Sequence, residues 1–386
     1  MRETKAIIEF GTSKISCTVA DRRQRMGLEV LASSQIAYSG IKKSNWVDSN
    51  EVYYALEQVL ETAERQAGFR IRNVEVGIPG SFLRIVNRRA QVATKGRVTE
   101  RDINFLAAKT QNFEIADDLA VVHEWPSWFL LDDGNVYLDP INISTKTLRG
   151  CMCYTLANRF FLNDVVGLMK HLGLRVDNFI PEPLAEALYL VPQERRDSLA
   201  VLIDIGYYTT NVSIIYGDSI LYFNTIPMGG GSITSDIAYV MKIDTDTAEQ
   251  LKRRYSFGLE ENNSVSYMYA KDQEGKLRKY PYDLVKEIID ARVEHLILYI
   301  SKLLARPERS LGKKLDIFLT GGGIAYMRGA SSFYRAVAGR TPLPIKVSSV
   351  KLQTPELHSA YAMLQFAYDG VFVQKPNIKR RGFLSR

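Results

Sequence analysis

The chain has few cysteines and histidines, and neither type is arranged as a metal or hydrolase site. Cys17, Cys151 and Cys153 are the three cysteines of 386 residues, which indicates a reducing compartment and excludes a disulfide framework. Cys151 and Cys153 alternate on a predicted strand, so we interpret them as core residues on one of its faces. The four histidines are scattered without ligand spacing. Metalloenzyme and hydrolase functions therefore have little support.

The chain also lacks a long apolar run. No segment reaches the roughly 18 apolar residues that span a bilayer, and residues 1–5 lead into a predicted strand without a signal-peptide core. We therefore expect a cytoplasmic protein. Fifty Lys and Arg against 43 Asp and Glu give a net charge of +7. That charge suits an anionic partner such as a membrane surface, a nucleic acid or an acidic peptide, although solubility alone also explains it.

Two stretches almost two hundred positions apart share one pattern. Residues 6–11 (AIIEFG) and 201–206 (VLIDIG) each form an apolar run that ends in an acid, an apolar residue and a glycine, before a hydroxyl-rich turn and a second strand. Glycine lets the backbone approach a phosphate, and the amides and hydroxyls of the turn can hold its oxygens. Glu9 and Asp204 stand where Mg²⁺ or its waters would be held. The repeat predicts a duplicated domain with a nucleotide between its halves, bound by Gly11, Thr12, Ser13, Lys14, Gly206, Tyr207, Tyr208, Thr209 and Thr210.

A third element supports a nucleotide site. Residues 316–320 form a short predicted strand that runs into Gly321, Gly322 and Gly323. The glycines would leave room for a base or ribose against the bare backbone, or they merely turn a strand into a helix. Together with the two hairpins, in this order and spacing, we favour the nucleotide site.

These motifs resemble those of the actin-like ATPase superfamily and, within it, of the bacterial FtsA family. The resemblance covers residues 5 to about 370. It runs through Phe10-Gly11-Thr12-Ser13-Lys14-Ile15, Leu148-Arg149-Gly150, Glu182-Pro183-Leu184-Ala185, Asp204-Ile205-Gly206, Ile226-Pro227-Met228-Gly229-Gly230, Ile233-Thr234-Ser235-Asp236-Ile237-Ala238 and Leu319-Thr320-Gly321-Gly322-Gly323.

The resemblance implies an α/β, actin-like fold of two duplicated, ribonuclease H-like lobes, with an FtsA-type α+β subdomain inserted in the first lobe. Local patterns agree with it, because apolar spacing predicts a helix from Asp48 or Ser49 to Gly68, a helix over 100–108 and a long helix over 282–304. We read 260–279 as a polar loop. We expect a first lobe (1–80, 174–198 and 355–372), its insertion (81–173), a second lobe (199–233 and 308–354), its insertion (234–307) and a basic tail (373–386).

The resemblance also implies ATP and Mg²⁺ as cofactors. Glu9 and Asp204 would hold the metal through water and act as the catalytic acids, and Gly229, Gly230 and Lys252 would join the nucleotide-binding residues. In FtsA-like proteins the second insertion receives the C-terminal peptide of the tubulin-like division protein FtsZ. The basic run that begins at Lys252 suits such a groove, although a charge run is usually a solvated face. The expected partner-binding residues are Arg253, Arg254 and Lys286.

The remaining implied partners are further copies of the chain in a filament and the inner face of the cell membrane, with no nucleic acid. The tail is too short and too broken by proline and glycine to form an amphipathic helix alone. Basic residues contribute about 1 kcal/mol each near an anionic leaflet, so we expect strong attachment only when a filament repeats the tail. The expected membrane residues are Lys379, Arg380, Arg381, Phe383 and Leu384.

The chain departs from the family pattern at its phosphate hairpins. Glu9 replaces the usual Asp, Tyr207 and Tyr208 replace two glycines, and Asn211 replaces another Asp. A bulky residue at positive φ costs roughly 1–2 kcal/mol, and the two rings would either fill part of the phosphate space or point away from it. We expect ATP binding with slow turnover at most.

Two other functions are open on the sequence. A small-molecule phosphotransferase of the same fold, such as a sugar kinase, would need a substrate carboxylate base near the first hairpin, and we find none beyond Glu9. A PilM-like pilus-assembly scaffold shares the FtsA-like subdomain arrangement. The run over residues 233–238 argues against PilM only moderately.

Overall fold

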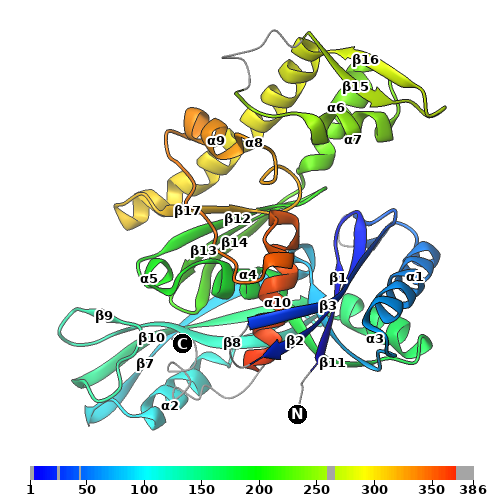
Figure 1. The fold of residues 1–386 in the computed structure, drawn as a ribbon. Helices are drawn as coiled ribbons and strands as arrows, with labels where there is room; N and C mark the ends of the chain where they lie inside the picture. The colour runs from blue at the N-terminus through cyan, green and yellow to red at the C-terminus, as the bar shows by residue number, and fades with distance from the viewer. Residues whose placement is uncertain (1–3, 24–26, 43–44, 259–265, 371–386) are drawn as a thin grey trace.

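The computed structural model describes residues 4–23, 27–42, 45–258 and 266–370 (Figure 1). Within these ranges, two sheets repeat one topology. In the first, β1 (Thr4–Phe10) pairs antiparallel with β2 (Lys14–Arg23) and parallel with β6 (Asn73–Ile78), and the order is completed by β3 (Gly27–Ala37) and β11 (Arg175–Pro181). In the second, β12 (Ala200–Ile205) pairs antiparallel with β13 (Thr210–Tyr216) and parallel with β17 (Asp316–Thr320), and β14 (Ser219–Ile226) lies beyond β13. The predicted duplication of the hairpin is therefore present in the fold.

Two helices pack between these sheets. The helices α4 (Glu182–Leu190) and α10 (His358–Asp369) contact each other in the middle of the molecule (Figure 1). Their apolar side chains share one core with residues of both sheets, such as Ile7 and Leu202. Both sheets therefore pack against the same central pair of helices.

The first sheet is covered by helices that the sequence predicts well. The Asp48 side chain accepts hydrogen bonds from the amides of Asn50 and Glu51 and caps α1 (Ser49–Ala67), which ends at Gly68 with φ of 79°. The helix α3 (Arg159–His171) packs on β11, and a small hairpin pairs β4 (Ile41–Lys42) with β5 (Asn45–Trp46). A short helix α5 (Gln193–Arg196) precedes β12.

A separate sheet forms the arm at the lower left of Figure 1. Its strand order is β7 (Leu83–Arg97), β10 (Ser144–Asn158), β8 (Leu119–Leu130) and β9 (Val136–Tyr137), and α2 (Glu100–Thr110) packs on β7. Cys151 and Cys153 are buried on β10, which confirms that both are core residues, and Cys17 is buried on β2.

The opposite end of the molecule carries α6 (Gly230–Met241), α7 (Thr245–Arg254), α8 (Tyr282–Leu311) and α9 (Ala330–Ala338). The prediction of a polar loop over 260–279 is wrong in part, because β15 (Tyr267–Lys271) and β16 (Leu277–Pro281) form a hairpin. The exposed Tyr267 and Tyr269 alternate with the buried Met268 and Ala270, which is the pattern of a half-buried strand. The helix α8 also extends past Pro307 to Leu311.

The described residues bear on the expected membrane attachment in two ways. No helix in the described part of the chain is long and apolar enough to cross a membrane. The predicted membrane residues Lys379, Arg380, Arg381, Phe383 and Leu384 lie outside the described residues. The domain boundaries stay a prediction.

Candidate functional site

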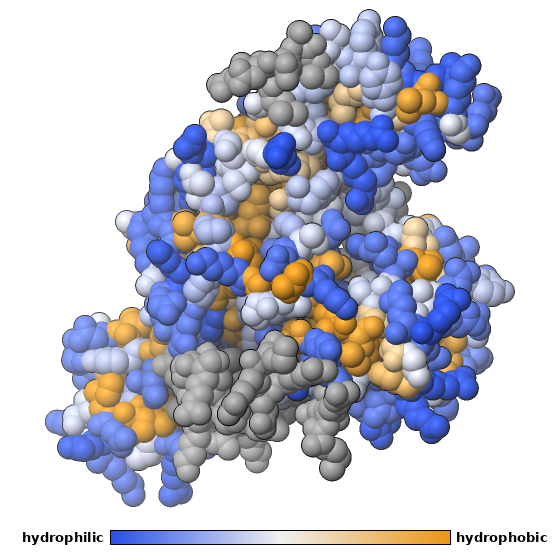
Figure 2. Space-filling model, viewed as in Figure 1, coloured by the Kyte–Doolittle hydropathy of each residue, from blue (hydrophilic) through white to orange (hydrophobic). Residues whose placement is uncertain are grey.

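The two glycine turns meet at one cleft. The backbone amide of Tyr208, in the second turn, donates a hydrogen bond of 3.0 Å to Oγ1 of Thr12, in the first turn. The cleft holds a cavity of about 190 Å³ whose lining includes Gly11, Ser13 and Lys14 from the first turn and Gly206 and Thr209 from the second. Figure 2 shows the molecule hollowed between the end that carries α6 and α7 and the lobe that carries α1.

The glycine run after β17 packs against the second turn. Gly321 has φ of 95°, and a Cβ on it would lie 2.3 Å from the carbonyl oxygen of Ile205. A Cβ on Gly323 would lie 2.3 Å from the carbonyl oxygen of Gly206, while the Gly323 amide donates to the Ile205 carbonyl at 2.7 Å. Both glycines are therefore needed for close backbone approach, a reason the sequence did not suggest. Gly321 and Gly322 line the cavity.

The predicted Gly229 and Gly230 serve the same packing. The Gly230 amide donates to the carbonyl of Gly206 at 2.9 Å, and a Cβ on Gly229 would lie 2.4 Å from that same oxygen. The start of α6 is thereby fixed against the second turn. Thr210 is buried, and its hydroxyl donates to the carbonyl of Met228, so it supports the turn from behind.

Four of the five carboxyl groups that line the cleft come from β1, β12 and α4. Glu9 and Asp204 come from the ends of β1 and β12, as the sequence predicts. Glu182 and Glu186, one helical turn apart on α4, join them. Sequence reasoning did not assign these two to the site, although Glu182 belongs to the motif at residues 182–185 that carries the family resemblance.

Burial dominates the electrostatics of these acids. It raises the pKa of Glu9, against hydrogen bonds that lower it, the first from Ser16. Burial also raises the pKa of Asp204 to about 6. The pKa values of Glu182 and Glu186 are raised well above the usual range by burial first and then by the neighbouring carboxylates. A cation in the cleft would relieve this repulsion.

The carboxyl groups of the cleft are suited to a cation that is also held by water or phosphate oxygens. Oε1 of Glu182 is buried without a hydrogen-bond partner. No three His, Cys, Asp or Glu side chains of the described residues come together as a direct metal cage. The unpartnered oxygen of Glu182 fits Mg²⁺, which keeps several waters and is bound through one or two carboxylates plus phosphate oxygens.

The tyrosine pair is unstrained. Among the described residues other than glycine, positive φ occurs at Asn142, Leu199 and Lys242, so the expected strain at Tyr207 and Tyr208 is absent. The Tyr207 ring lies against Gly231 of α6, with the Lys252 ammonium 5.2 Å from its centroid. Tyr207 still lines the cavity, whereas the Tyr208 side chain is 44% exposed. The two rings thus adopt different positions, one at the cleft wall and one toward solvent.

The Asn211 side chain lines the cavity and is bonded to one of the cleft acids. Its Nδ2 donates to Oδ2 of Asp204 at 3.2 Å, and its Oδ1 accepts from the Thr225 hydroxyl at 3.0 Å. Both ends of this amide are therefore used within the second lobe.

Within the basic run 252–254, Arg253 and Arg254 are exposed, and only Lys252 departs from the interpretation as a solvated face. Lys252 is fully buried, and its ammonium donates to the Gly230 carbonyl, to the Thr234 hydroxyl and to the Glu249 carboxylate. An ammonium has three donors, so those of Lys252 are all used in joining α6 to α7. The sequence could not show this, because the partners lie up to 22 positions away.

The three predicted partner-binding residues have separate environments. Arg253 lines the cleft and pairs with Glu249 at 2.9 Å. Arg254 donates to the carbonyl of Tyr269 on β15, and Lys286 pairs with Asp290 at 3.0 Å. By position, Arg253 therefore belongs to the cleft between the two turns. Other cleft residues that sequence reasoning missed are Gln35, whose amide oxygen accepts from Lys14 at 2.7 Å, and Glu356 and Ser359 near α10.

Comparison with known proteins gives consistent matches over most of the chain. A family model for cell division protein FtsA matches residues 201–365. Cell division protein FtsA of Bacillus subtilis is 22% identical over 375 residues, which cover 95% of this chain and 84% of that protein. The Pseudomonas aeruginosa protein of the same name is 24% identical over 367 residues, which cover 93% of this chain and 88% of that protein.

Solved structures show the same actin-like fold. A PilM-PilN type IV pilus biogenesis complex matches with a TM-score of 0.63 and 16% identity, covering 94% of this chain and 98% of that chain. MreB5 of Spiroplasma citri bound to ADP matches with a TM-score of 0.56 and 15% identity, covering 98% of each. A MamK double helical filament matches with a TM-score of 0.53 and 11% identity, covering 95% and 98%.

Proposed function

We propose that this chain is an FtsA-like scaffold of bacterial cell division, because it is related to the cell-division protein FtsA along nearly its whole length. It binds ATP with Mg²⁺, assembles into filaments and ties FtsZ to the cytoplasmic face of the membrane. The observation that supports nucleotide binding most strongly is the meeting of both glycine turns at one cleft, with Tyr208 bonded to Thr12.

The cleft residues divide the binding task between them. The amides and hydroxyls of the two turns, with Lys14, face the phosphates, and Glu9 and Asp204 hold Mg²⁺ through its waters. The ion supplies positive charge against the phosphate oxygens. Glu182 and Glu186 add negative charge behind it and thereby favour a divalent over a monovalent cation.

We propose that nucleotide turnover is slow. Hydrolysis needs a positioned water, and the second turn that would position it carries Tyr207 in the cavity wall and Asn211 bonded to Asp204. Each loss of about 1.4 kcal/mol in transition-state stabilisation slows turnover about tenfold. The chain would then act as a nucleotide-dependent scaffold rather than as a turnover enzyme.

Co-purification from the native cell tests the division role. Recovery of FtsZ with the tagged full chain is the expected result. Recovery of pilus-assembly proteins without FtsZ would favour the PilM-like alternative, and transfer of phosphate to a metabolite would favour the phosphotransferase.

The FtsZ site is tested by charge reversal. We propose that the C-terminal peptide of FtsZ binds near Arg254 on α7 and Lys286 on α8. The variant Arg254→Glu/Lys286→Glu should weaken FtsZ binding at least tenfold. Lys302→Glu/Arg306→Glu, a matched double reversal further along the exposed part of α8, should not. Equal binding by both variants would overturn this site.

A further inference from the structure

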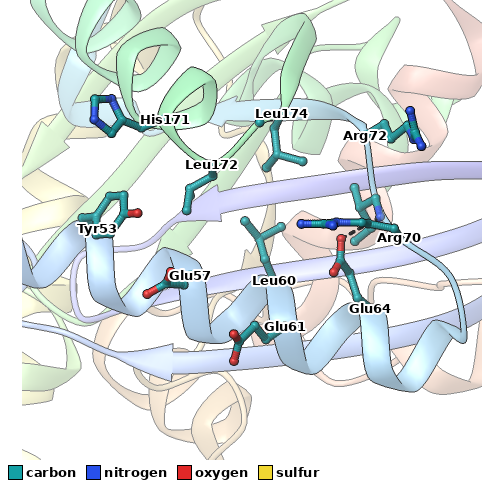
Figure 3. Close-up of a pocket in the computed structure, with 12 residues that line it drawn as sticks. Tyr53, Glu57, Leu60, Glu61, Glu64, Arg70, Arg72, His171, Leu172 and Leu174 are labelled. Atoms are coloured by element: carbon teal, nitrogen blue, oxygen red, sulfur yellow. Dashed lines mark hydrogen bonds between the residues drawn. The ribbon is translucent and has the colours of Figure 1, made fainter.

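A second large cavity lies on the outer side of the first lobe, away from the nucleotide cleft. It has a volume of about 540 Å³ and lies between α1, the segment 70–72 and the end of α3 (Figure 3). Tyr53, Glu57, Glu61 and Glu64 of α1 line one side, and Leu172 and Leu174 contribute apolar surface opposite. We call this cavity the α1 groove.

The charges of the α1 groove are separated along its length. Figure 3 shows Tyr53 and Glu57 at one end, with Glu61 beyond them, and Arg72 at the other end, from which the Arg70 side chain extends back over Leu60. Glu64 is already engaged, because its Oε1 accepts from the amide of Ile71 at 2.8 Å. Glu57 and Glu61 form the acidic end of the groove. That end suits a ligand with adjacent positive charges.

The chain contains such a ligand. Residues 371–386 (VFVQKPNIKRRGFLSR) hold five basic residues and no acid, with Lys379-Arg380-Arg381 adjacent and Phe383-Leu384 directly after them. This segment follows Gly370, the residue that ends α10. Residues 379–384 can lie about 30–45 Å from Gly370 at about 3.3 Å per residue. A compact chain of this length has a radius of gyration of about 21 Å, so the segment can reach the groove.

A competing groove is less suitable on charge. The cavity beside the end of α10, of about 500 Å³, is closer to the start of the tail. Its lining includes Arg22, Lys346 and Arg196, and its Asp369 is already paired with Arg22. A basic segment would be repelled there. The α1 groove is therefore the better site for residues 379–384.

We propose that the α1 groove binds the chain's own basic tail, with Lys379-Arg380-Arg381 against Glu57 and Glu61 and with Phe383 and Leu384 against its apolar side. This docking does not depend on the proposed division role. Its regulatory consequence does rest on that role, because a tail held in the groove is withheld from the membrane until something displaces it.

Selective labelling of the full chain tests the proposal. The three native cysteines are buried, so Ser385→Cys can be labelled with a fluorescent dye. The anisotropy of the dye should be high at low salt and fall at high salt, since the contact is ionic. In the variant Glu57→Lys/Glu61→Lys, the anisotropy of the dye should be low even at low salt. It should then equal the anisotropy of the labelled peptide 371–386 alone. Both positions lie on the surface of a capped helix, so the fold should persist.

A matched control separates a specific groove from general charge. Glu287→Lys/Glu294→Lys makes the same change in net charge on α8 and should leave the anisotropy high. Anisotropy that falls equally in both variants, or that is already low in the parent chain, would overturn the proposal. Anisotropy that rises with protein concentration would also overturn it, because the tail would then bind another copy.

Vesicle binding tests whether docking withholds the tail from the membrane. At concentrations where the chain is monomeric, Glu57→Lys/Glu61→Lys should bind vesicles of 30% anionic lipid more tightly than the parent chain and than Glu287→Lys/Glu294→Lys, by roughly tenfold for about 1.4 kcal/mol of lost tail contact. If the parent chain and both double variants bind vesicles equally while the anisotropy results are as expected, the tail docks in the groove but this docking does not control membrane binding. FtsZ co-purification is independent of both results.

Discussion

At the scale of single residues, buried ionisable groups control how stability depends on pH. His123 is buried next to Trp125 and Phe366, and burial lowers its pKa to about 4 from a usual 6.5. The unfolded chain therefore binds more protons than the folded chain between these values. His123 contributes stability above pH 6.5, and that contribution is lost as the pH falls toward 4.

The expected effect of His123 is measurable by replacement. Between pH 8 and pH 5, the linkage relation gives a loss of about 2 kcal/mol in the free energy of unfolding from this group. His123→Phe keeps an aromatic ring and removes the titration, so its loss over the same range should be smaller by about that amount. Urea denaturation at both pH values checks this. An identical loss in parent and variant would contradict it.

The cleft carboxyls act in the opposite direction. The pKa of Glu186 is raised by burial and by Asp204, Glu182 and Glu9, so its contribution to stability is present at low pH and is lost as the pH rises. Glu186→Gln should therefore stabilise the ligand-free chain at pH 8 and have little effect at pH 4. Glu294→Gln, exposed on α8, is the control and should change neither value. Thermal melts at the two pH values distinguish these outcomes.

At the scale of elements, close backbone packing at the end of β17 positions the second turn. Gly321→Ala should destabilise the fold by more than about 2 kcal/mol, because its Cβ would overlap the Ile205 carbonyl and φ is positive. Gly339→Ala is the matched control, since its φ is also positive but nothing lies within 4 Å of its Cβ. It should cost only about 1–2 kcal/mol. Equal losses in urea denaturation would show that the close approach is unimportant.

Elements with a local signature were predictable from the sequence. The strand–acid–glycine pattern identified both turns, and Asp48 and Gly68 marked the ends of α1, because each signal lies within a few residues of its effect. Glu182 and Glu186 were not assigned to the site, since only the packing of α4 between two sheets brings them to the strand ends. Lys252 was misread for the same reason, because its buried partner Thr234 comes from another helix.

At the scale of the whole molecule, the structure is closed where the two glycine turns meet. Tyr208 of one lobe is bonded to Thr12 of the other. The cavity of about 190 Å³ is smaller than the roughly 300–1,000 Å³ of typical ligand pockets. We therefore expect nucleotide binding to require the lobes to separate at this contact. Nucleotide would then stabilise a different relative position of the lobes.

The central claim is that the cleft between the two turns binds nucleotide, and calorimetry with ATP and Mg²⁺ on the full chain tests it most directly. We predict saturable ATP binding that weakens at least tenfold without Mg²⁺ and in Asp204→Ala, with hydrolysis far slower than one turnover per minute. Asp316→Ala, an acid at the opposite end of β17, should bind as the parent does. No heat of binding at millimolar ATP would contradict the account.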